Sequence, residues 1–474
     1  MTVSKIKDTI APYAEKLSTF FGGRLYPLLV ALLTLIGHIS GLEFYFNTVN
    51  MLAVSAALVL CKSFVPILPF MLTVVFQVNL KHSPGVPTWS NYYYTTGKLI
   101  TLCVLIAILI AALVVFIIKN VAPKIRRDGI KKIPLLPSVA LLSVAFLLNG
   151  VGGEWTLSGL IYAIAQVLIY ALLFYVVYYG LEGEDSAHLL ERLTYLALLV
   201  AFVLIGEMVF MFATYDNIFQ DGALVKESIN LGWGIWNPLG FSLTVLIPLL
   251  MRGAMKSDMP WLYLAASVLT WVFAVLTLSR NSLIFATLTL GACVIIACFK
   301  SERKKAFRII TLSLIAFAAI AFVILFDKIS AILSDLLSRG MSDNGRFTLW
   351  GIGIDNFLDS PIFGNGFFSY GETDVFKVAA FIPTLAHNTV VEMLSACGIL
   401  GLAAYLFYRA CTVIPFVKKP TFDKLMLSLP ILVTLCMSLL DNFVFHFYTV
   451  FWYLICLAVA IKLQRDTEAA YDTN

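Results

Sequence analysis

The stretch Thr101-Leu-Cys-Val-Leu-Ile-Ala-Ile-Leu-Ile-Ala-Ala-Leu-Val-Val-Phe-Ile-Ile118 contains no charged side chain. A helix needs about 20 mostly apolar residues to cross the hydrocarbon core of a bilayer, so this stretch, within residues 98–118, predicts a transmembrane helix. The whole chain is similar: 60% of its 474 residues are hydrophobic, 13% are charged, and the mean hydropathy is +0.91. Soluble domains have about 25% charged residues. The composition therefore excludes a soluble enzyme, a disordered chain and a fibrous protein.

Apolar stretches of similar length recur on both sides of this one. Together with it they are 25–41, 48–61, 64–79, 98–118, 135–150, 157–180, 194–213, 232–251, 260–278, 282–299, 309–326, 389–408, 425–440 and 443–461. The second, third and thirteenth are short or contain proline, so they are candidates for kinked or re-entrant segments. We predict an all-α, polytopic integral membrane protein with about 14 transmembrane helices, within a range of 12–14.

The lysines and arginines gather in a few short segments, which set the orientation. They are the N-terminal Lys5, Lys7, Lys16 and Arg24, the segment Lys119–Lys132, the segment Lys300–Arg308, and Arg409, Lys418, Lys419 and Lys424. Cytoplasmic loops carry an excess of Lys and Arg, and fourteen spans with a cytoplasmic N-terminus put all four groups on that side. Both termini are therefore predicted to be cytoplasmic, with the first span kept as an anchor because no cleavage site follows it. The net charge of +5 reflects topology and predicts no nucleic-acid partner.

One outer loop, residues 327–388, is much longer than the others. Two parts of it have apolar residues at helical spacing, Lys328–Arg339 and Arg346–Leu358, and both predict amphipathic helices that lie on the outer leaflet. We therefore divide the chain into helices 1–11 (residues 1–326), the outer loop (residues 327–388), and helices 12–14 with a cytoplasmic tail (residues 389–474). The alternative for the loop is a structured cap without chemistry.

Three arginines are predicted to lie outside, against the orientation rule: Arg280, Arg339 and Arg346. Each alone is explained by a snorkelling anchor or a solvated helix surface. Together, Arg280 at a tight turn and Arg346 in the first turn of a helix favour an anion site, because guanidinium groups form paired hydrogen bonds to phosphate. A lipid-linked diphosphate is the anion expected at a membrane surface.

His387 closes the outer loop directly before a span, and histidine can act as a general base near neutral pH. Asn388 and Glu392 share a helix face and are candidates for orienting it. Glu207, within the seventh span, and His446, at the start of the last, are further candidates, since ionisable groups inside a membrane are costly. The alternatives without a catalytic role are a histidine that only forms loop hydrogen bonds and a carboxylate that only pairs with a neighbouring side chain.

Four motifs resemble the O-antigen ligase/polymerase superfamily in order and spacing. They are Thr277-Leu-Ser-Arg280, Gly345-Arg-Phe-Thr-Leu-Trp350, Pro361-Ile-Phe-Gly-Asn-Gly366, and Ala386-His-Asn388 with Glu392-Met-Leu-Ser-Ala-Cys-Gly-Ile-Leu-Gly401. The resemblance covers roughly residues 190–440. One departure is Ala386, where many members have a second His or a Ser.

The resemblance implies a GT-C-like enzyme on the outer face of the bacterial cytoplasmic membrane, facing the periplasm. Such enzymes move a glycan from undecaprenyl diphosphate to an acceptor sugar, with inversion and without a metal or other cofactor. It implies that Arg280 and Arg346 bind the diphosphate and that His387 is the base. The implied partners are the lipid-linked donor, an acceptor that is a lipid-linked repeat unit or lipid A-core, and membrane lipids, with a chain-length regulator as a further candidate.

Several functions remain open at this point. The span count favours a polymerase of surface polysaccharide or O-antigen repeat units over an O-antigen ligase that acts on lipid A-core. A lipid-linked oligosaccharide flippase is the rival from another class, but transporters often place polar groups at the membrane midplane. A scaffold protein would leave the outer arginines and His387 without a role. A metal-dependent transferase is disfavoured because the first outer loop, Gly41–Asn50, has no Asp-x-Asp pair.

Overall fold

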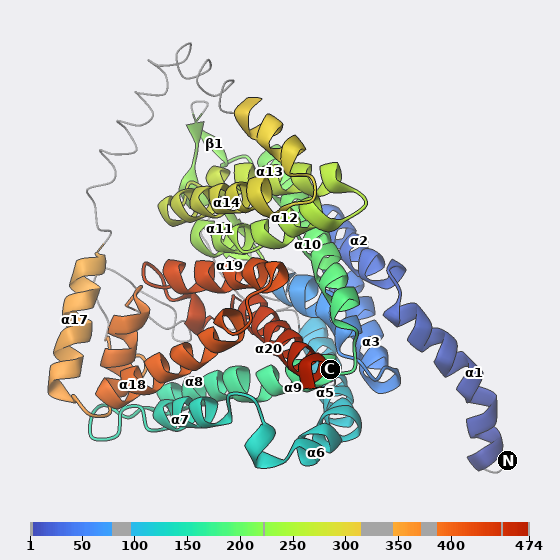
Figure 1. Cartoon of the computed structure of the whole chain (residues 1–474). Helices are drawn as coiled ribbons and strands as arrows, with labels where there is room; N and C mark the ends of the chain where they lie inside the picture. Colours follow the sequence, from blue (N-terminus) through green and yellow to red (C-terminus); the bar gives the residue numbers. More distant parts are fainter. Residues whose placement is uncertain are drawn as a thin grey trace.

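The computed structural model of the chain describes residues 3–77, 96–220, 223–313, 345–370, 386–446 and 449–472. The regular structure within these ranges is almost entirely helical, and many helices lie side by side with roughly aligned axes (Figure 1). Two small antiparallel hairpins are the exception: β1 (Phe219–Gln220) with β2 (Ala223–Leu224), and β3 (Asn230–Leu231) with β4 (Gly234–Ile235). The all-α membrane class is confirmed.

The first half of the chain forms a series of helices, several of them interrupted by π-helical or 3-10 turns. They are α1 (Val3–Gly22), α2 (Leu25–Ser40), α3 (Glu43–Leu60), η1 (Val65–Ile67), η2 (Phe70–Val74), α4 (Val75–Gln77), α5 (Thr96–Phe116), η4 (Ile117–Val121), α6 (Ala122–Lys132), α7 (Leu136–Leu147), α8 (Leu157–Val167), η5 (Leu168–Leu173), α9 (Phe174–Leu181) and α10 (Ser186–Thr214).

The second half contains the elements that carry the predicted site. They are η6 (Lys226–Ser228), α11 (Trp236–Thr244), α12 (Ile247–Lys256), α13 (Pro260–Leu276), α14 (Arg280–Lys300), α17 (Arg346–Asp359), α18 (Thr389–Val417), α19 (Phe422–Met437), η8 (Phe443–Phe445) and α20 (Val450–Asp472).

The predicted count of about 14 spans is not confirmed. Among the described residues, seven helical segments are long and apolar enough to cross a membrane, or eight if the pair Ala11–Gly22 and Leu25–Ser40, bent by 69°, forms one span. One part of the difference has a local cause: residues 64–77 contain three short elements instead of one helix, and α7, α13 and α19 have only 12, 17 and 16 residues. Another part is the predicted span 309–326, of which residues 314–326 lie outside the described residues.

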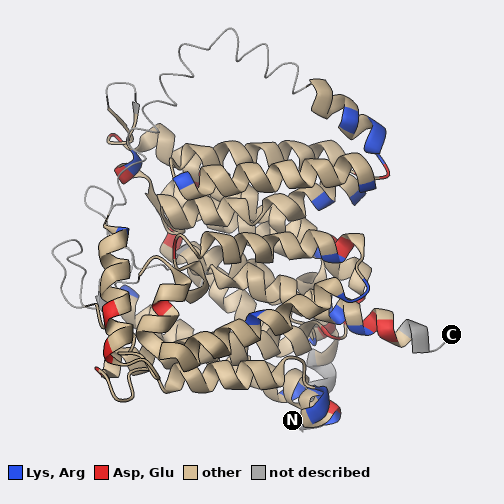
Figure 2. Ribbon diagram, turned by 60° about the vertical axis from the view of Figure 1, so that its left-hand side comes forward, with Lys and Arg blue, Asp and Glu red and all other residues tan. Residues whose placement is uncertain are grey.

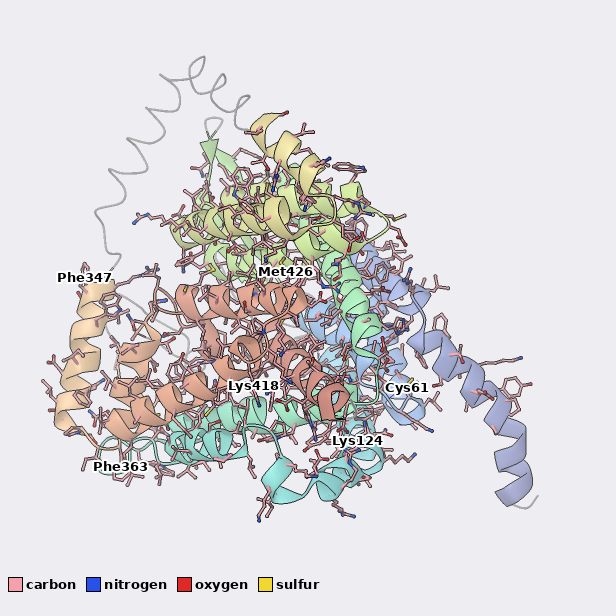
Figure 3. All side chains as sticks on the ribbon, viewed as in Figure 1. Cys61, Lys124, Phe347, Phe363, Lys418 and Met426 are labelled. Carbon is pink, nitrogen blue, oxygen red and sulfur yellow. The ribbon has the colours of Figure 1, made fainter. Side chains whose placement is uncertain are left out.

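Charge is distributed unevenly along the bundle. Figure 2 shows most lysines and arginines near the end that carries the C-terminus, and Figure 3 places Lys124 well away from Phe347 in α17. This distribution agrees with the orientation rule. The cytoplasmic placement of both termini stays a prediction. One assignment needs correction: Arg409 is not in a loop with Lys418, because it lies within α18 and its side chain is buried.

The end opposite the basic residues is built around a break in α18. Gly398 has a φ of 65°, which L side chains rarely adopt, and a Cβ there would lie 2.4 Å from the carbonyl oxygen of Ile362. The segment Pro361–Gly366 pairs with the broken helix: Asn365 N donates to Ser395 O, and Ile399 N donates to Pro361 O. This segment follows α17, which ends at Asp359 and runs across the end of the bundle (Figure 1).

A close approach between α11 and α14 fixes a second part of this end. A Cβ on Gly240 would lie 1.9 Å from Ser282 Oγ, so only glycine allows the two helices to pack at this distance. The preceding turn has Leu278 at a φ of 55°, and Ser279 caps α14 by accepting a hydrogen bond from Ser282 N. The packing therefore holds Arg280, the first residue of α14, beside the start of α11.

Candidate functional site

His387 lies in a strained turn directly before α18. Its φ is 50°, which is uncommon for a residue with a side chain. The residue before it is held on both sides: Ala386 N donates to Glu392 Oε2 at 2.8 Å, and Ala386 O accepts from Trp350 Nε1 at 2.8 Å. Asn388, the residue after it, caps α18 by accepting from Val390 N and Val391 N. The turn is thus fixed by α17 and α18 together.

The imidazole of His387 is paired with a buried carboxylate. His387 Nδ1 lies 2.9 Å from Asp441 Oδ1, and the Asp441 side chain is 7% exposed while that of His387 is 33% exposed. Because an ionised carboxylate can only accept, Nδ1 is the donor and Nε2 carries the lone pair of the neutral ring. The arrangement can accept a proton at Nε2 and stabilise the imidazolium that forms.

Asp441 itself is held in place and kept ionised. It lies in the connection between α19 and η8, where its Oδ2 accepts from Asn237 Nδ2 at 3.2 Å and its Oδ1 accepts from Asn442 N at 2.9 Å. Burial alone raises the pKa of this carboxyl. The hydrogen bond from His387, the nearby imidazoles of His387 and His446, and the Asn442 N–H outweigh burial, so the pKa lies well below its usual range.

A chain of hydrogen bonds connects the imidazole pair to the segment that carries Arg280. Asn237, in the first turn of α11, donates to Asp441 and accepts from Ser279 Oγ at 2.8 Å. Ser279 directly precedes Arg280. Three elements remote in sequence, the start of α11, the start of α14 and the end of α19, therefore meet at one place.

Arg346 reaches the same region through α17. It is the first residue of that helix, and Trp350, one turn later on the same face, donates to the carbonyl oxygen next to His387. Leu349, Tyr370 and Ala386 form a small buried cluster beneath this contact. Ala386 is completely buried there, so the position that departs from the superfamily pattern faces the packing of α17 in this chain.

Lys226 brings a third positive charge to the two arginines. It lies in η6, on the connection between α10 and α11, with its Nζ 5.0 Å from the centre of the Trp236 ring. Burial lowers the pKa of Lys226, and the positive charges of Arg280 and Arg346 lower it further while Glu227 opposes them. Both arginines are therefore close enough for their charges to act on Lys226.

The remaining candidates divide into two groups. Glu392 and Asn388 support the His387 turn, and His446 lies near Asp441, whose pKa it lowers. Glu207 is fully buried in α10 and accepts from Trp233 Nε1 at 2.8 Å, which favours the structural alternative for that carboxylate. Arg339 and the predicted helix at Lys328–Arg339 lie outside the described residues.

Sequence reasoning missed Asp441 and Lys226. Asp441 lies between two predicted spans, at 425–440 and 443–461. A lone acidic residue between two apolar spans is a candidate functional residue, so the sequence alone could have indicated it. Lys226 lies between the predicted spans 194–213 and 232–251 and belongs to none of the four motifs. No pattern in the sequence connects it to Arg280, because the contact depends on how η6 folds back over α11.

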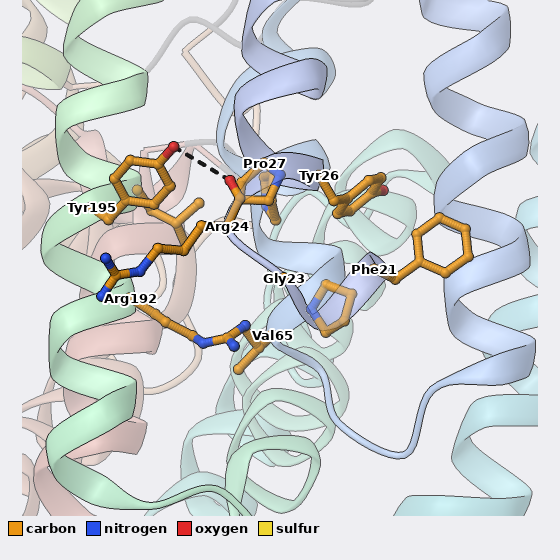
Figure 4. Close-up of a pocket in the computed structure, with 11 residues that line it drawn as sticks. Phe21, Gly23, Arg24, Tyr26, Pro27, Val65, Arg192 and Tyr195 are labelled. Atoms are coloured by element: carbon orange, nitrogen blue, oxygen red, sulfur yellow. Dashed lines mark hydrogen bonds between the residues drawn. The ribbon is translucent and has the colours of Figure 1, made fainter. Parts of the chain in front are cut away.

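A small pocket lies away from this site, at the bend between α1 and α2. Figure 4 shows it between Phe21, Tyr26 and Pro27 on one side and Arg192 and Tyr195 of α10 on the other. Tyr195 donates a hydrogen bond to the carbonyl oxygen of Arg24 at 3.3 Å. None of the predicted site residues lines this pocket.

Comparison with known proteins supports the sequence motifs. No curated protein matches the chain. Residues 265–406 match the model of a family described as O-Antigen ligase, and this stretch contains Arg280, Arg346, His387 and Glu392. The match confirms the resemblance of this part of the chain to the O-antigen ligase/polymerase superfamily.

Proposed function

We propose that the protein is an inverting membrane glycosyltransferase that moves a glycan from undecaprenyl diphosphate to the hydroxyl of an acceptor sugar. The observation that carries the proposal is the 2.9 Å contact between His387 Nδ1 and Asp441 Oδ1. A partly exposed imidazole held by a buried carboxylate is an arrangement suited to a general base. His387 lies within residues 265–406, which match the O-antigen ligase model, and Asp441 lies outside that match.

The reaction needs one proton transfer and one displacement. Nε2 of neutral His387 takes the proton of the acceptor hydroxyl as that oxygen attacks the anomeric carbon from the face opposite the diphosphate. The new C–O bond forms while the bond between the anomeric carbon and the diphosphate oxygen breaks, so the configuration inverts. Asp441 stabilises the imidazolium, and the diphosphate leaves with the electron pair and its charge.

The leaving diphosphate is assigned to the three cations. Ser279, directly before Arg280, is connected to Asp441 through Asn237, and the charges of Arg280 and Arg346 act on Lys226. Positive groups placed where negative charge develops stabilise the transition state. We therefore assign no step to a metal ion, and we expect activity to persist in a chelator.

Polymerase and ligase share this chemistry and differ in the acceptor. We keep the polymerase of surface-polysaccharide or O-antigen repeat units as the first candidate and the O-antigen ligase as the alternative. The site would face the periplasm from the bacterial inner membrane, because α17, which begins at Arg346, lies at one end of the bundle (Figure 1) and most basic residues lie near the other (Figure 2). A flippase would leave the His387–Asp441 pair without a role.

A deletion strain separates these functions. The surface glycan and its lipid-linked intermediates are analysed in the deletion strain and after complementation with wild type or His387→Ala. Single repeats on lipid in the deletion strain indicate a lost polymerase, and an intact lipid-linked polymer indicates a lost ligase. An unchanged glycan contradicts both, and full rescue by His387→Ala contradicts the assigned base.

A further inference from the structure

Arg409 is a buried cation in the middle of a helix that can span the membrane. It lies in α18, eleven residues after the break at Gly398, and is 8% exposed. A charge at such depth is costly unless the protein surrounds it. In the part of the chain that the structure describes, no carboxylate forms an ion pair with Arg409. Four tyrosine rings surround its guanidinium at 4.6–5.8 Å: Tyr170, Tyr405, Tyr408 and Tyr453.

One of these tyrosines, Tyr170, connects Arg409 to the backbone of η8. Arg409 Nη2 donates to the hydroxyl oxygen of Tyr170 at 3.3 Å, and the Tyr170 hydroxyl donates to Val444 O at 2.7 Å. With its oxygen engaged by the guanidinium, the hydroxyl has its hydrogen directed to Val444, and hydrogen bonds in such a chain strengthen one another. Arg409 thus acts on the backbone of η8 through a single hydroxyl.

Two further side chains, on the same helical segment as Tyr170, donate to Phe445, the residue after Val444. Gln166 Nε2 donates to Phe445 O at 2.7 Å, and Tyr162 OH donates to the same oxygen at 2.9 Å. Residues 162, 166 and 170 are spaced by four and follow one face from α8 into the π-helical η5. Three side chains of one helix therefore hold the carbonyls of two consecutive residues in η8.

The segment that they hold carries one half of the imidazole pair. η8 covers Phe443–Phe445, with Asp441 two residues before it and His446 directly after it. A 3-10 helix of three residues is too short to satisfy its own carbonyls, so these need donors from other segments inside a membrane protein. Donating to these carbonyls is one role of Tyr162, Gln166 and Tyr170. A second role is to fix the position of Asp441, because a shift of η8 would move Asp441 away from His387.

We propose that Arg409 and the row Tyr162–Gln166–Tyr170 are positioning residues that set the geometry of the His387–Asp441 pair. The inference rests on the proposed function. None of these residues touches the reacting groups. Their effect passes through η8, and displacements of about 1 Å in a catalytic group can lower a rate about a hundredfold.

The decisive variant is Tyr170→Phe, which removes one hydroxyl and keeps the ring. Its matched control is Tyr408→Phe, because Tyr408 is equally buried against Arg409 and its hydroxyl makes no hydrogen bond to η8. Full-length proteins are compared in liposomes with a lipid-diphosphate-linked glycan as donor. For Tyr170→Phe we expect kcat to fall about tenfold with an unchanged KM, together with a lower melting temperature because Val444 O loses its buried donor. For Tyr408→Phe we expect wild-type kinetics.

A second readout needs no glycan substrate. Diethyl pyrocarbonate modifies imidazoles, and mass spectrometry gives its rate at His387 alone. We expect this rate to rise several-fold in Tyr170→Phe, as the ring loses its fixed contact, and to stay unchanged in Tyr408→Phe. Equal kcat and modification rates in wild type and Tyr170→Phe would overturn the inference, as would equal changes in both variants. Absence of glycan transfer by wild type would overturn the proposed function instead, while the modification rates still decide the positioning.

Discussion

His387 Nδ1 and Asp441 Oδ1 lie 2.9 Å apart although 54 residues separate them in the chain. The contact joins the turn before α18 to the connection after α19. The two helices are also bound to each other at this point, because Thr389 N donates to Ser438 O at 3.0 Å. The pair is therefore set by the packing of two helices and not by one flexible loop.

Asp441→Asn tests the role of the carboxylate. The amide can donate to Nδ1 and so favours the imidazole form that has its proton on Nε2, where no proton can be accepted. We expect kcat to fall by at least about a hundredfold, with KM for the lipid-linked donor little changed. Steady-state kinetics in liposomes measure both. Asp359→Asn, an exposed acid at the end of α17, is the control and should keep wild-type rates.

Lys226 predicts how donor binding depends on pH. Burial and the charges of Arg280 and Arg346 lower the pKa of Lys226, so its ammonium loses the proton at lower pH than an ordinary lysine. Affinity for undecaprenyl diphosphate should therefore be full at neutral pH and fall as pH rises through this lowered pKa. Lys226→Arg should remove the alkaline fall, and Lys226→Gln should bind weakly at every pH. The same alkaline fall in wild type and Lys226→Arg would refute the assignment.

Arg280→Ala and Arg346→Ala test the diphosphate site. A charge-assisted hydrogen bond contributes about 1.5–3 kcal/mol, so each variant should lose roughly ten- to a hundredfold in kcat/KM. The amount and length of the glycan in complemented cells give an independent measure. Arg126→Ala, an exposed arginine in α6, is the matched control. If both site variants make wild-type glycan, the diphosphate binds elsewhere.

Gly398→Ala tests the break in α18 that shapes this end of the molecule. Its φ of 65° and the carbonyl oxygen of Ile362, 2.4 Å from an added Cβ, both oppose a side chain. We expect a loss of about 1–3 kcal/mol in the free energy of unfolding, seen as a lower melting temperature in detergent. Gly291→Ala in α14 has open space and helical geometry, so it should be neutral or slightly stabilising. Equal melting temperatures for both variants would argue against a rigid break.

Much of the fold was predictable because the length of an apolar stretch and the helical spacing of its apolar residues can be read from a short piece of sequence. The helix predicted at Arg346–Leu358 is α17, and it ends at Asp359, before the proline and glycines of the following motif. The number of spans was not predictable in the same way. Hydropathy gives the apolar stretches, but whether each is one long helix depends on prolines, π-helical turns and packing, as in residues 64–77.

The candidate site was predictable only as separate residues. Arg280, Arg346 and His387 were recognisable from their motifs. The structure places hydrogen bonds beside them: Ser279 donates to Asn237, Trp350 donates to Ala386 O, and His387 contacts Asp441. Asp441 and Lys226 were not, because their roles depend on contacts between distant segments. Arg409 was placed in a loop because a hydropathy pattern ends a span at the first charge, whereas tyrosines from three helices bury this one.

The central claim is that His387 acts as the base in a glycan transfer that needs no metal. The most direct test uses purified protein in liposomes with an undecaprenyl-diphosphate-linked glycan and an acceptor, with EDTA present throughout. We predict that wild type extends or transfers the glycan in EDTA and that His387→Ala, folded and with an unchanged melting temperature, forms no product. Full activity of His387→Ala, or wild-type activity that disappears in EDTA and returns with Mg²⁺, would contradict the account.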